Sequence, residues 1–227
     1  MGMPLKLDDG VDSWNTVMFL YNAALKEVNT KVEILRDEFV HVHNYNPIEY
    51  IKTRIKTPES IVKKLRTDGY ESSINNMIDH VNDIAGIRVV CSFTSDIYHL
   101  AEMIGKQNDL TVLSVKDYIK NPKVSGYKSY HMIVTVPIFL GDKEMDVKVE
   151  VQIRTIAMDF WASLEHKIYY KFEGDAPDYI SRDLQECAHI VSDLDAKMLS
   201  LNEAILKVQK GENAGESDAT GTFTTSV

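Results

Sequence analysis

The residues best suited to chemistry lie in one short stretch, Val147 to Arg154. Its odd-numbered positions are all aliphatic, and its even-numbered positions are Lys148, Glu150, Gln152 and Arg154. Successive side chains of a β-strand point to opposite faces of the sheet, so this alternation predicts a strand with one buried face and one polar face. A carboxylate among phosphate-binding cations is typical of metal-dependent phosphate chemistry. A solvated sheet surface is the alternative, and the rest of the chain must decide between the two.

A cationic segment, residues 51–66, is a second cluster that could meet this polar face. Six lysines and arginines fall within it, although the chain as a whole is acidic. Thr57 followed by Pro58 predicts the start of a helix. The free N–H groups of that helix start, with Arg54 and Lys56 beside them, form a candidate anion site. A solvated basic helix face is the alternative.

The third cluster is a loop of lysines, tyrosines and a histidine, residues 116–131. Its Asn-Pro and Ser-Gly pairs mark turns, and its side chains suit phosphate recognition and base stacking. A further candidate is Asp83, which precedes a predicted strand containing Arg88. Gly86 between them lets another group approach closely. A lone Asp at such a position is usually a helix or turn cap.

Helices and strands that alternate along the chain must position these clusters. Apolar residues at spacings of three and four predict one long helix from Trp14 to Val42 and another from Leu184 to Val208. Strands are predicted at residues 87–93, 111–115, 132–137 and 147–154, and shorter helices at 57–66, 70–82, 95–107 and 155–172. These elements predict an α/β (α+β) fold, in which helices flank a mixed β-sheet.

Composition is that of an ordinary soluble globular protein. Of its 227 residues, 44% are hydrophobic and 26% charged, and the net charge of −9 argues against a protein that coats nucleic acid. No apolar run approaches the ~20 residues of a membrane span, and no apolar signal core begins the chain, so we expect a cytoplasmic protein without membrane contact. Cys91 and Cys187 are expected to be buried thiols in a reducing compartment.

The chain is long enough for a single domain with helical extensions. We expect residues 12–210 to form that domain, after a flexible lead-in at 1–11 and before a disordered tail at 211–227. Two long apolar helix seams are more than one modest sheet can cover, so we expect a homo-oligomer assembled through the terminal helices.

Taken together, five segments resemble the synthetase motifs of the RelA/SpoT family in order and spacing. They are Arg54-Ile-Lys56 with Ser60 and Lys64, Asp83-Ile-Ala-Gly-Ile-Arg88, Lys116-Asp-Tyr-Ile, Ser125-Gly-Tyr127-Lys-Ser-Tyr-His131, and Val149-Glu150-Val-Gln152-Ile-Arg154-Thr. The run from Met158 to His166 and the flanking helices resemble the small alarmone synthetases, the RelP type more than the RelQ type. The resemblance covers about residues 11–210 and implies a nucleotidyltransferase-like synthetase domain that assembles as a homotetramer.

The activity implied by this resemblance is that of a pyrophosphokinase, which moves the β,γ-pyrophosphate of ATP to the ribose 3′-hydroxyl of GDP or GTP and yields AMP with ppGpp or pppGpp. By analogy Asp83 and Glu150 are catalytic and bind Mg²⁺, and whether Glu150 also accepts the hydroxyl proton stays open. ATP would meet Arg54 and Arg88 at its adenine and Lys56, Ser60 and Lys64 at its phosphates. The acceptor would meet Lys116, Lys123, Tyr127, His131, Gln152 and Arg154, with Tyr127 stacked on guanine.

Two departures from the family bear on function. No His-Asp dipeptide occurs in the chain, so neither the hydrolase half nor the regulatory domains of the long family members are expected. Ser114 stands where relatives often carry a basic residue, which leaves the preference between GDP and GTP open. The alternative function is a non-catalytic RNA- or nucleotide-binding regulator, with Tyr127 stacking on single strands. Two isolated carboxylates among phosphate-binding cations favour the enzyme over this regulator.

Overall fold

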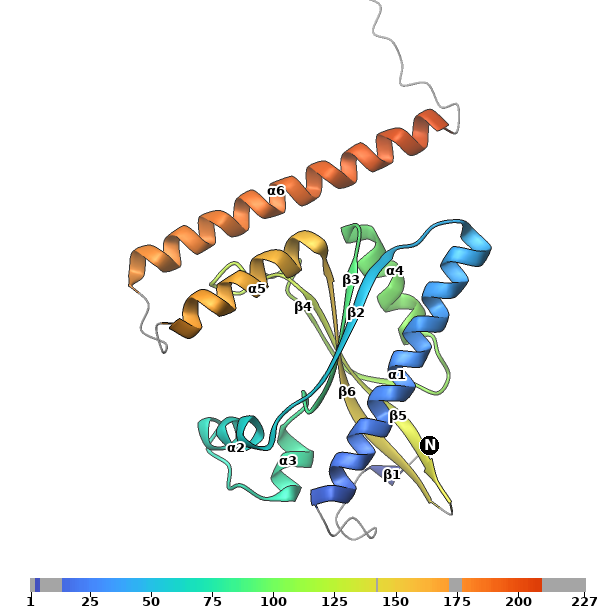
Figure 1. Ribbon diagram of the computed structural model, residues 1–227, viewed down its shortest axis with the longest axis vertical. Helices are drawn as coiled ribbons and strands as arrows, with labels where there is room; N and C mark the ends of the chain where they lie inside the picture. Colours follow the sequence, from blue (N-terminus) through green and yellow to red (C-terminus); the bar gives the residue numbers. More distant parts are fainter. Residues whose placement is uncertain (1–2, 5–13, 142, 172–176, 210–227) are drawn as a thin grey trace, which may run out of the picture.

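The computed structural model describes residues 3–4, 14–141, 143–171 and 177–209. Within them, helices flank a single mixed β-sheet (Figure 1). The strands are β1 (Met3–Pro4), β2 (Ile48–Ile55), β3 (Ala85–Cys91), β4 (Thr111–Asp117), β5 (Tyr130–Leu140) and β6 (Lys143–Thr155). The helices are α1 (Trp14–His43), α2 (Pro58–Thr67), α3 (Ile74–His80), α4 (Thr94–Gly105), α5 (Ile156–Lys171) and α6 (Asp178–Gln209). None of these helices is long and apolar enough to cross a membrane.

The strand first recognised in the sequence, β6, lies at the centre of the sheet. The strand order is β2-β3-β6-β5-β4, and β1 adds a short parallel pairing to β6. β3 runs parallel to β6, whereas the β2–β3, β5–β6 and β4–β5 pairs are antiparallel. The parallel pairing places the segment after Asp83 directly beside the strand that carries Glu150.

The apolar face of the sheet is covered by α1 and α4 (Figure 1). The predicted inward residues of β6 are all fully buried there: Val147, Val149, Val151 and Ile153. Burial of each such side chain stabilises the fold by about 1.5–3 kcal/mol. α1 supplies its own apolar seam, which begins with Val17, Leu20 and Tyr21. The central strand is therefore held by its odd-numbered residues, and its even-numbered residues are free to form a site.

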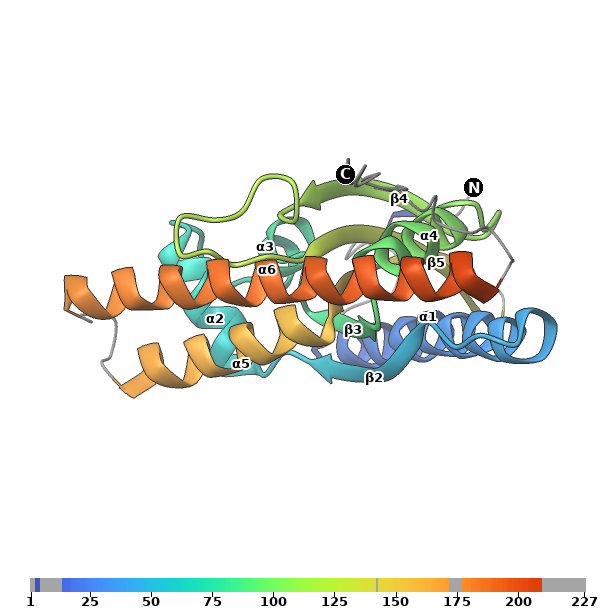
Figure 2. The same cartoon turned by 90° about the horizontal axis from the view of Figure 1, so that it is seen from above.

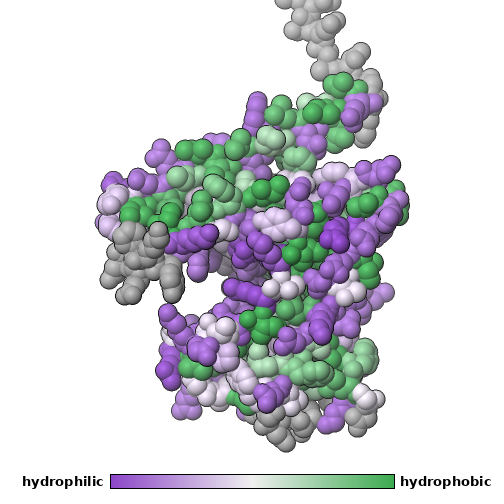
Figure 3. Space-filling model, viewed as in Figure 1, coloured by the Kyte–Doolittle hydropathy of each residue, from purple (hydrophilic) through white to green (hydrophobic). Residues whose placement is uncertain are grey.

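Among the described residues, helices cover the opposite, polar face of the sheet at its two ends. α2 and α3 lie at one end, and α5 packs against β6 and β3 at the other, with α6 alongside it (Figures 1 and 2). In the space-filling view, the molecule is hollowed between these two parts, and hydrophilic side chains border the hollow (Figure 3).

Most of the predicted elements are confirmed, although several bounds differ and β1 and β2 were not predicted. The strand β2 was missed, because its cations disguise the alternation. β5 and β6 are each longer than predicted, and they pair as an antiparallel hairpin. Cys91 is buried as predicted, but the prediction for Cys187 is wrong, because that residue is exposed on α6. The predicted tail and all of the predicted lead-in except residues 3–4 lie outside the described residues.

Candidate active site

A row of polar residues crosses the five longer strands of the sheet. Its members are paired one to the next in the order Lys116, His131, Gln152, Arg88 and Lys52. Directly paired residues on neighbouring strands point to the same face, and so do residues two apart on one strand, such as Gln152 and Glu150. The sheet thus brings together side chains that belong to three separate clusters in the sequence.

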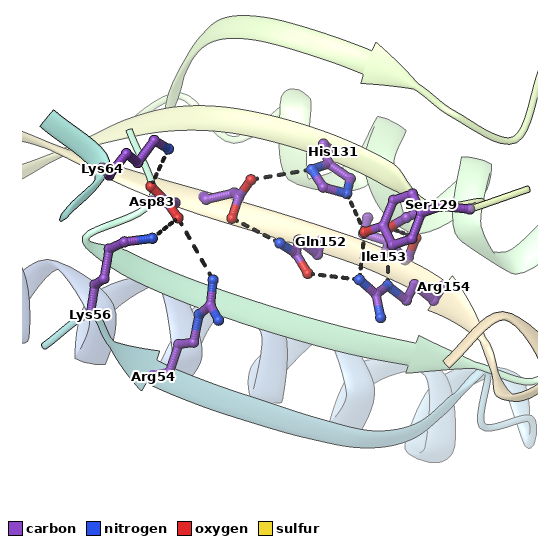
Figure 4. Close-up of polar contacts among 11 residues, drawn as sticks. Arg54, Lys56, Lys64, Asp83, Ser129, His131, Gln152, Ile153 and Arg154 are labelled. Carbon is purple, nitrogen blue, oxygen red and sulfur yellow. Dashed lines mark hydrogen bonds and ion pairs between the residues drawn. The ribbon is translucent and has the colours of Figure 1, made fainter. Parts of the chain in front are cut away.

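Asp83 lies just before β3 and is surrounded by cations from β2 and α2 (Figure 4). One of its carboxylate oxygens lies 2.6 Å from Nζ of Lys56, and the other lies 2.7 Å from Nζ of Lys64. The guanidinium of Arg54 is 3.7 Å away. Burial raises the pKa of Asp83, but the hydrogen bonds and charges of the two lysines outweigh burial and hold the pKa below its usual value. Asp83 is therefore ionised, and its negative charge offsets the positive charges of Lys56 and Lys64.

The predicted helix start forms α2 and supports this cluster. Thr57 is the N-cap and accepts a hydrogen bond from the Ser60 backbone N–H at 3.4 Å, with Pro58 in the first turn. Ile61 and Leu65 anchor the helix in the core, which directs Lys64 toward Asp83. Ser60 is exposed in the first turn, so its hydroxyl and the ammonium group of Lys56 lie at one end of the site.

Glu150 belongs to a closed ring of five hydrogen-bonded side chains (Figure 4). Gln152 donates from Nε2 to Glu150 at 2.8 Å, and Arg154 donates from Nη2 to Gln152 Oε1 at 3.2 Å. Arg154 also donates to the Tyr127 hydroxyl, which lies 2.8 Å from Nε2 of His131. Nδ1 of His131 lies 3.2 Å from the second Glu150 oxygen and completes the ring.

Donors match acceptors around the whole ring when Nδ1 of His131 carries a proton, because Nε2 then accepts from the Tyr127 hydroxyl. Burial raises the pKa of Glu150, but the hydrogen bond and charge of His131 and the hydrogen bond from Gln152 outweigh it and lower the pKa. Glu150 is therefore an oriented carboxylate, held on two sides.

Glu150 borders two cavities. The first, of about 200 Å³, is lined by Lys52, Thr53, Arg54, Gly86, Ile87, Arg88, Glu150 and Gln152. The second, of about 260 Å³, is lined by Lys64, Asn82, Asp83, Ser114, Lys116, Tyr118, Lys123, His131, Ile133 and Glu150. Arg54 and Arg88, which were predicted for adenine, thus line the first cavity. Of the six residues predicted for the acceptor, Lys116, Lys123 and His131 line the second cavity. Gln152 lines the first cavity instead, and Tyr127 and Arg154 line neither.

The loop between β4 and β5 places Tyr127 beside the second cavity. The ammonium group of Lys123 lies 4.9 Å from the centre of the Tyr127 ring, and the guanidinium of Arg154 lies 5.0 Å from it. Lys123 is exposed, whereas Arg154 is buried. Lys123 can therefore move aside for a ligand, and Arg154 is a fixed support behind the ring.

Asp159 on α5 is a buried site residue that the sequence analysis did not select. Its Oδ1 accepts from Nη1 of Arg88 and from Nη1 of Arg154, each at 3.1 Å, and its Oδ2 accepts from the Tyr50 hydroxyl at 2.7 Å. Burial raises the pKa of Asp159, but the Tyr50 hydrogen bond and the two arginines outweigh it and lower the pKa. The available signal was a lone carboxylate in the otherwise apolar helix start Ile156 to Ala162.

The carboxylates of Asp83 and Glu150 fit a hard divalent cation that is also coordinated by a substrate. Asp83 and Glu150 line the same cavity, and no group of three or more His, Cys, Asp or Glu side chains gathers for a metal among the described residues. Mg²⁺ usually takes one or two protein carboxylates and fills its remaining positions with phosphate oxygens and water. Two carboxylates beside the cations Lys56 and Lys64 are consistent with this coordination.

The sheet and the site are typical of a nucleotide-binding protein. Comparison with known proteins gives its family. The model for the region found in RelA/SpoT proteins matches residues 53–175, and the chain belongs to that family. It is 45% identical over 195 residues to the GTP pyrophosphokinase YwaC of Bacillus subtilis (strain 168), a match that covers 86% of this chain and 93% of YwaC.

Solved structures give the same result for the fold and narrow the class. The small alarmone synthetase 2 of Bacillus subtilis superposes with a TM-score of 0.77 at 44% identity, covering 84% of this chain and 98% of that one. The small alarmone synthetase 1 of Bacillus subtilis, bound to its product pppGpp, superposes with a TM-score of 0.80 at 35% identity, covering 85% and 98%. The predicted resemblance to small alarmone synthetases and the predicted fold class are confirmed.

Proposed function

We propose that this chain is a (p)ppGpp synthetase that transfers the β,γ-pyrophosphate of ATP to the 3′-hydroxyl of GDP or GTP. Its membership of the RelA/SpoT family supports this reaction. The structural observation that carries it is the position of Glu150, which borders both cavities of the polar sheet face. A donor in one cavity and an acceptor in the other would meet at this carboxylate.

The first cavity suits ATP. Arg54 and Arg88 line it from neighbouring strands, and their flat guanidinium groups can stack on adenine. The triphosphate would then extend toward Lys56, Lys64 and the start of α2. In the structure these lysines are bound to Asp83, so ATP phosphates would compete with that carboxylate for them.

The second cavity suits the guanine nucleotide. Tyr127 offers its ring for stacking on guanine, and Lys116, Lys123 and His131 offer cations and hydrogen bonds to the phosphates and ribose. Ser114 lines the same cavity. Because serine carries no charge, it adds nothing to the electrostatic binding of a third phosphate, and both GDP and GTP are candidate acceptors.

Asp83 and Glu150 would hold a Mg²⁺ ion together with ATP phosphate oxygens. When bound, such an ion offsets negative charge on the transferred group and helps to align it. The protein cations beside it are Lys56 and Lys64, each within 2.7 Å of Asp83.

In the proposed reaction the 3′-oxygen of the acceptor attacks the β-phosphorus of ATP. The bond between that phosphorus and the oxygen bridging the α- and β-phosphates breaks, and AMP leaves with the bridging oxygen. Glu150 would accept the 3′-hydroxyl proton, because its lowered pKa keeps it ionised and the hydrogen bonds from His131 and Gln152 hold it in place.

We also propose that the protein works in the cytoplasm, that residues 12–210 act as one domain, and that the enzyme is a homotetramer. Exposed apolar residues on α6 support the assembly. An RNA partner is not part of the proposal.

The reaction is tested by mixing purified protein with Mg²⁺, labelled ATP and GDP, and separating the nucleotides. The expected result is equal amounts of AMP and ppGpp, and neither when EDTA replaces Mg²⁺. A matched sample with Glu150→Gln controls for contaminating kinases. Release of ADP or of free pyrophosphate, with no guanosine tetraphosphate, would overturn the proposal.

A further inference from the structure

One buried carboxylate joins the two halves of the proposed site. Arg88 lines the donor cavity, and Arg154 donates to the hydroxyl of Tyr127, beside the acceptor cavity. Both arginines donate to the same oxygen of Asp159, each at 3.1 Å. The side chain of Asp159 is 4% exposed and that of Arg154 is 5% exposed, whereas that of Arg88 is 29% exposed. Water therefore has little access to the carboxylate itself.

Charge explains why such a contact matters. Two guanidinium groups held side by side repel each other, and the charge of Arg154 acts on Arg88 in this way. The carboxylate of Asp159 lies between them and offsets that repulsion. Charge-assisted hydrogen bonds of this kind also fix the planes of the guanidinium groups. Without Asp159, Arg88 loses this carboxylate, and within the part of the chain that the structure describes Arg154 keeps only its hydrogen bonds to neutral side chains.

We propose that Asp159 is a positioning residue that sets the donor and acceptor subsites together, by holding Arg88 and Arg154 on one carboxylate oxygen. The inference rests on the proposed function, in which Arg88 meets ATP and Arg154 supports the guanine platform. Asp159 itself borders neither cavity. It acts on ATP through Arg88, and on the guanine nucleotide through Arg154 and Tyr127.

Asp159→Asn is the first variant, because it removes the charge and keeps the shape. Its matched control is Asp195→Asn, since Asp195 is also a buried carboxylate and accepts from Thr155 at 2.8 Å without touching the two arginines. Tyr50→Phe removes only the contact to the other Asp159 oxygen. Thermal unfolding and circular dichroism are recorded for all three variants, so that loss of fold is seen directly.

Equilibrium binding is the primary measurement, because it does not depend on turnover. Calorimetry gives the Kd of a non-hydrolysable ATP analogue and, separately, of GDP. Asp159→Asn is expected to weaken both by about tenfold or more, as loss of hydrogen bonds to charged groups implies. Asp195→Asn should change neither, and Tyr50→Phe should change both by less than Asp159→Asn does. In turnover, Asp159→Asn should raise both KM values more than it lowers kcat.

Two double variants separate positioning from general stability. In an Arg88→Ala background, Asp159→Asn should no longer change the Kd of the ATP analogue but should still weaken GDP. In an Arg154→Ala background the pattern should reverse. Equal losses in every background, or an Asp159→Asn protein that is folded and binds both nucleotides normally, would overturn the inference. If the wild-type protein binds both nucleotides but makes no ppGpp, the proposed function fails and the positioning test still stands; if it binds neither, both fail.

Discussion

The Tyr127 hydroxyl lies 2.8 Å from Nε2 of His131, and the other ring nitrogen of His131 lies 3.2 Å from Glu150. The residue proposed to stack on guanine is thus tied through one histidine to the carboxylate proposed to take the proton. Arg154 donates to the same hydroxyl. Binding of the acceptor base and orientation of the reacting carboxylate therefore depend on shared hydrogen bonds.

This arrangement separates the roles of the Tyr127 ring and hydroxyl. Tyr127→Ala removes both, and it should raise the KM of the acceptor much more than that of ATP, since base stacking contributes roughly 1–3 kcal/mol. Tyr127→Phe keeps the ring but frees His131 and Arg154. We expect it to leave the acceptor KM closer to normal and to lower kcat by about fivefold, as for loss of the one hydrogen bond that orients His131.

Steady-state kinetics with each substrate varied in turn measure these effects. A Tyr127→Phe variant with the kcat of the wild type would show that the five-residue hydrogen-bond network does not orient Glu150. Equal damage to both KM values by Tyr127→Ala would show instead that Tyr127 only packs the loop.

The two carboxylates can be tested separately from the fold. Asp83→Asn and Glu150→Gln should each lower product formation by at least about 100-fold. Asp83→Asn removes a proposed metal ligand, and Glu150→Gln removes a proposed metal ligand that is also the candidate base. Circular dichroism should not change. Asp83→Asn also frees Lys56 and Lys64, so in EDTA this variant should bind ATP at least as tightly as the wild type.

Weaker ATP binding by Asp83→Asn in EDTA would mean that the carboxylate organises the lysines and does not merely hold a cation. Near-normal turnover by both variants would sink the catalytic assignment altogether.

The polar face of β6 could be predicted from the sequence because the strand alternates strictly. Val147, Val149, Val151 and Ile153 fix which face is buried, so Glu150 and Gln152 must lie on the other. The helix start at Thr57 and Pro58 could also be predicted, because it depends on neighbours a few residues away.

What the sequence could not give were contacts across long separations. Asp159 reaches Arg88, 71 positions earlier in the chain, and Tyr50, 109 positions earlier. No local spacing marks such a contact, because it arises only when α5 folds back over β3 and β2. Cys187 failed for a related reason: its helix seam is apolar along its length, but the domain covers only part of it.

The pH dependence of stability should distinguish Asp159 from Asp195. The folded-state pKa of Asp159 is lowered, so its ionised form stabilises the fold above the unfolded pKa of about 3.9, and this contribution is lost as the pH falls through the folded pKa. The wild type should therefore be more stable than Asp159→Asn at pH 7, and the difference should shrink below about pH 4.

Asp195 has the opposite sign, because burial raises its folded-state pKa. Its ionised form costs stability above that pKa, so Asp195→Asn should be as stable as the wild type at pH 7 or more stable. Urea unfolding across pH 3 to 8 measures both. If Asp159→Asn is as stable as the wild type at pH 7, the buried ion pairs do not support the fold. Asp159→Ala leaves both arginines without their carboxylate partner and should lower the free energy of unfolding by about 3–5 kcal/mol.

The C-terminal half of α6 carries apolar residues that a partner chain would cover. Its buried residues are Leu184, Ala188 and Asp195, whereas the apolar seam continues beyond them. Leu194, Met198, Leu201 and Ile205 are each about half exposed, at the spacings of four and three that place them on one face. In Figure 1 this half of α6 extends past the end of α5.

A helix seam of this length on a second copy of the chain would cover these residues, and we expect a homo-oligomer, a tetramer more than a dimer. Met198→Glu and Leu201→Glu place charges in that seam and should reduce the mass measured by light scattering, with helix content unchanged. Glu203→Lys, an exposed position off the seam, is the matched control and should leave the mass unaltered. A wild-type monomer at micromolar concentration would contradict the prediction, because the exposed seam would then need no partner chain.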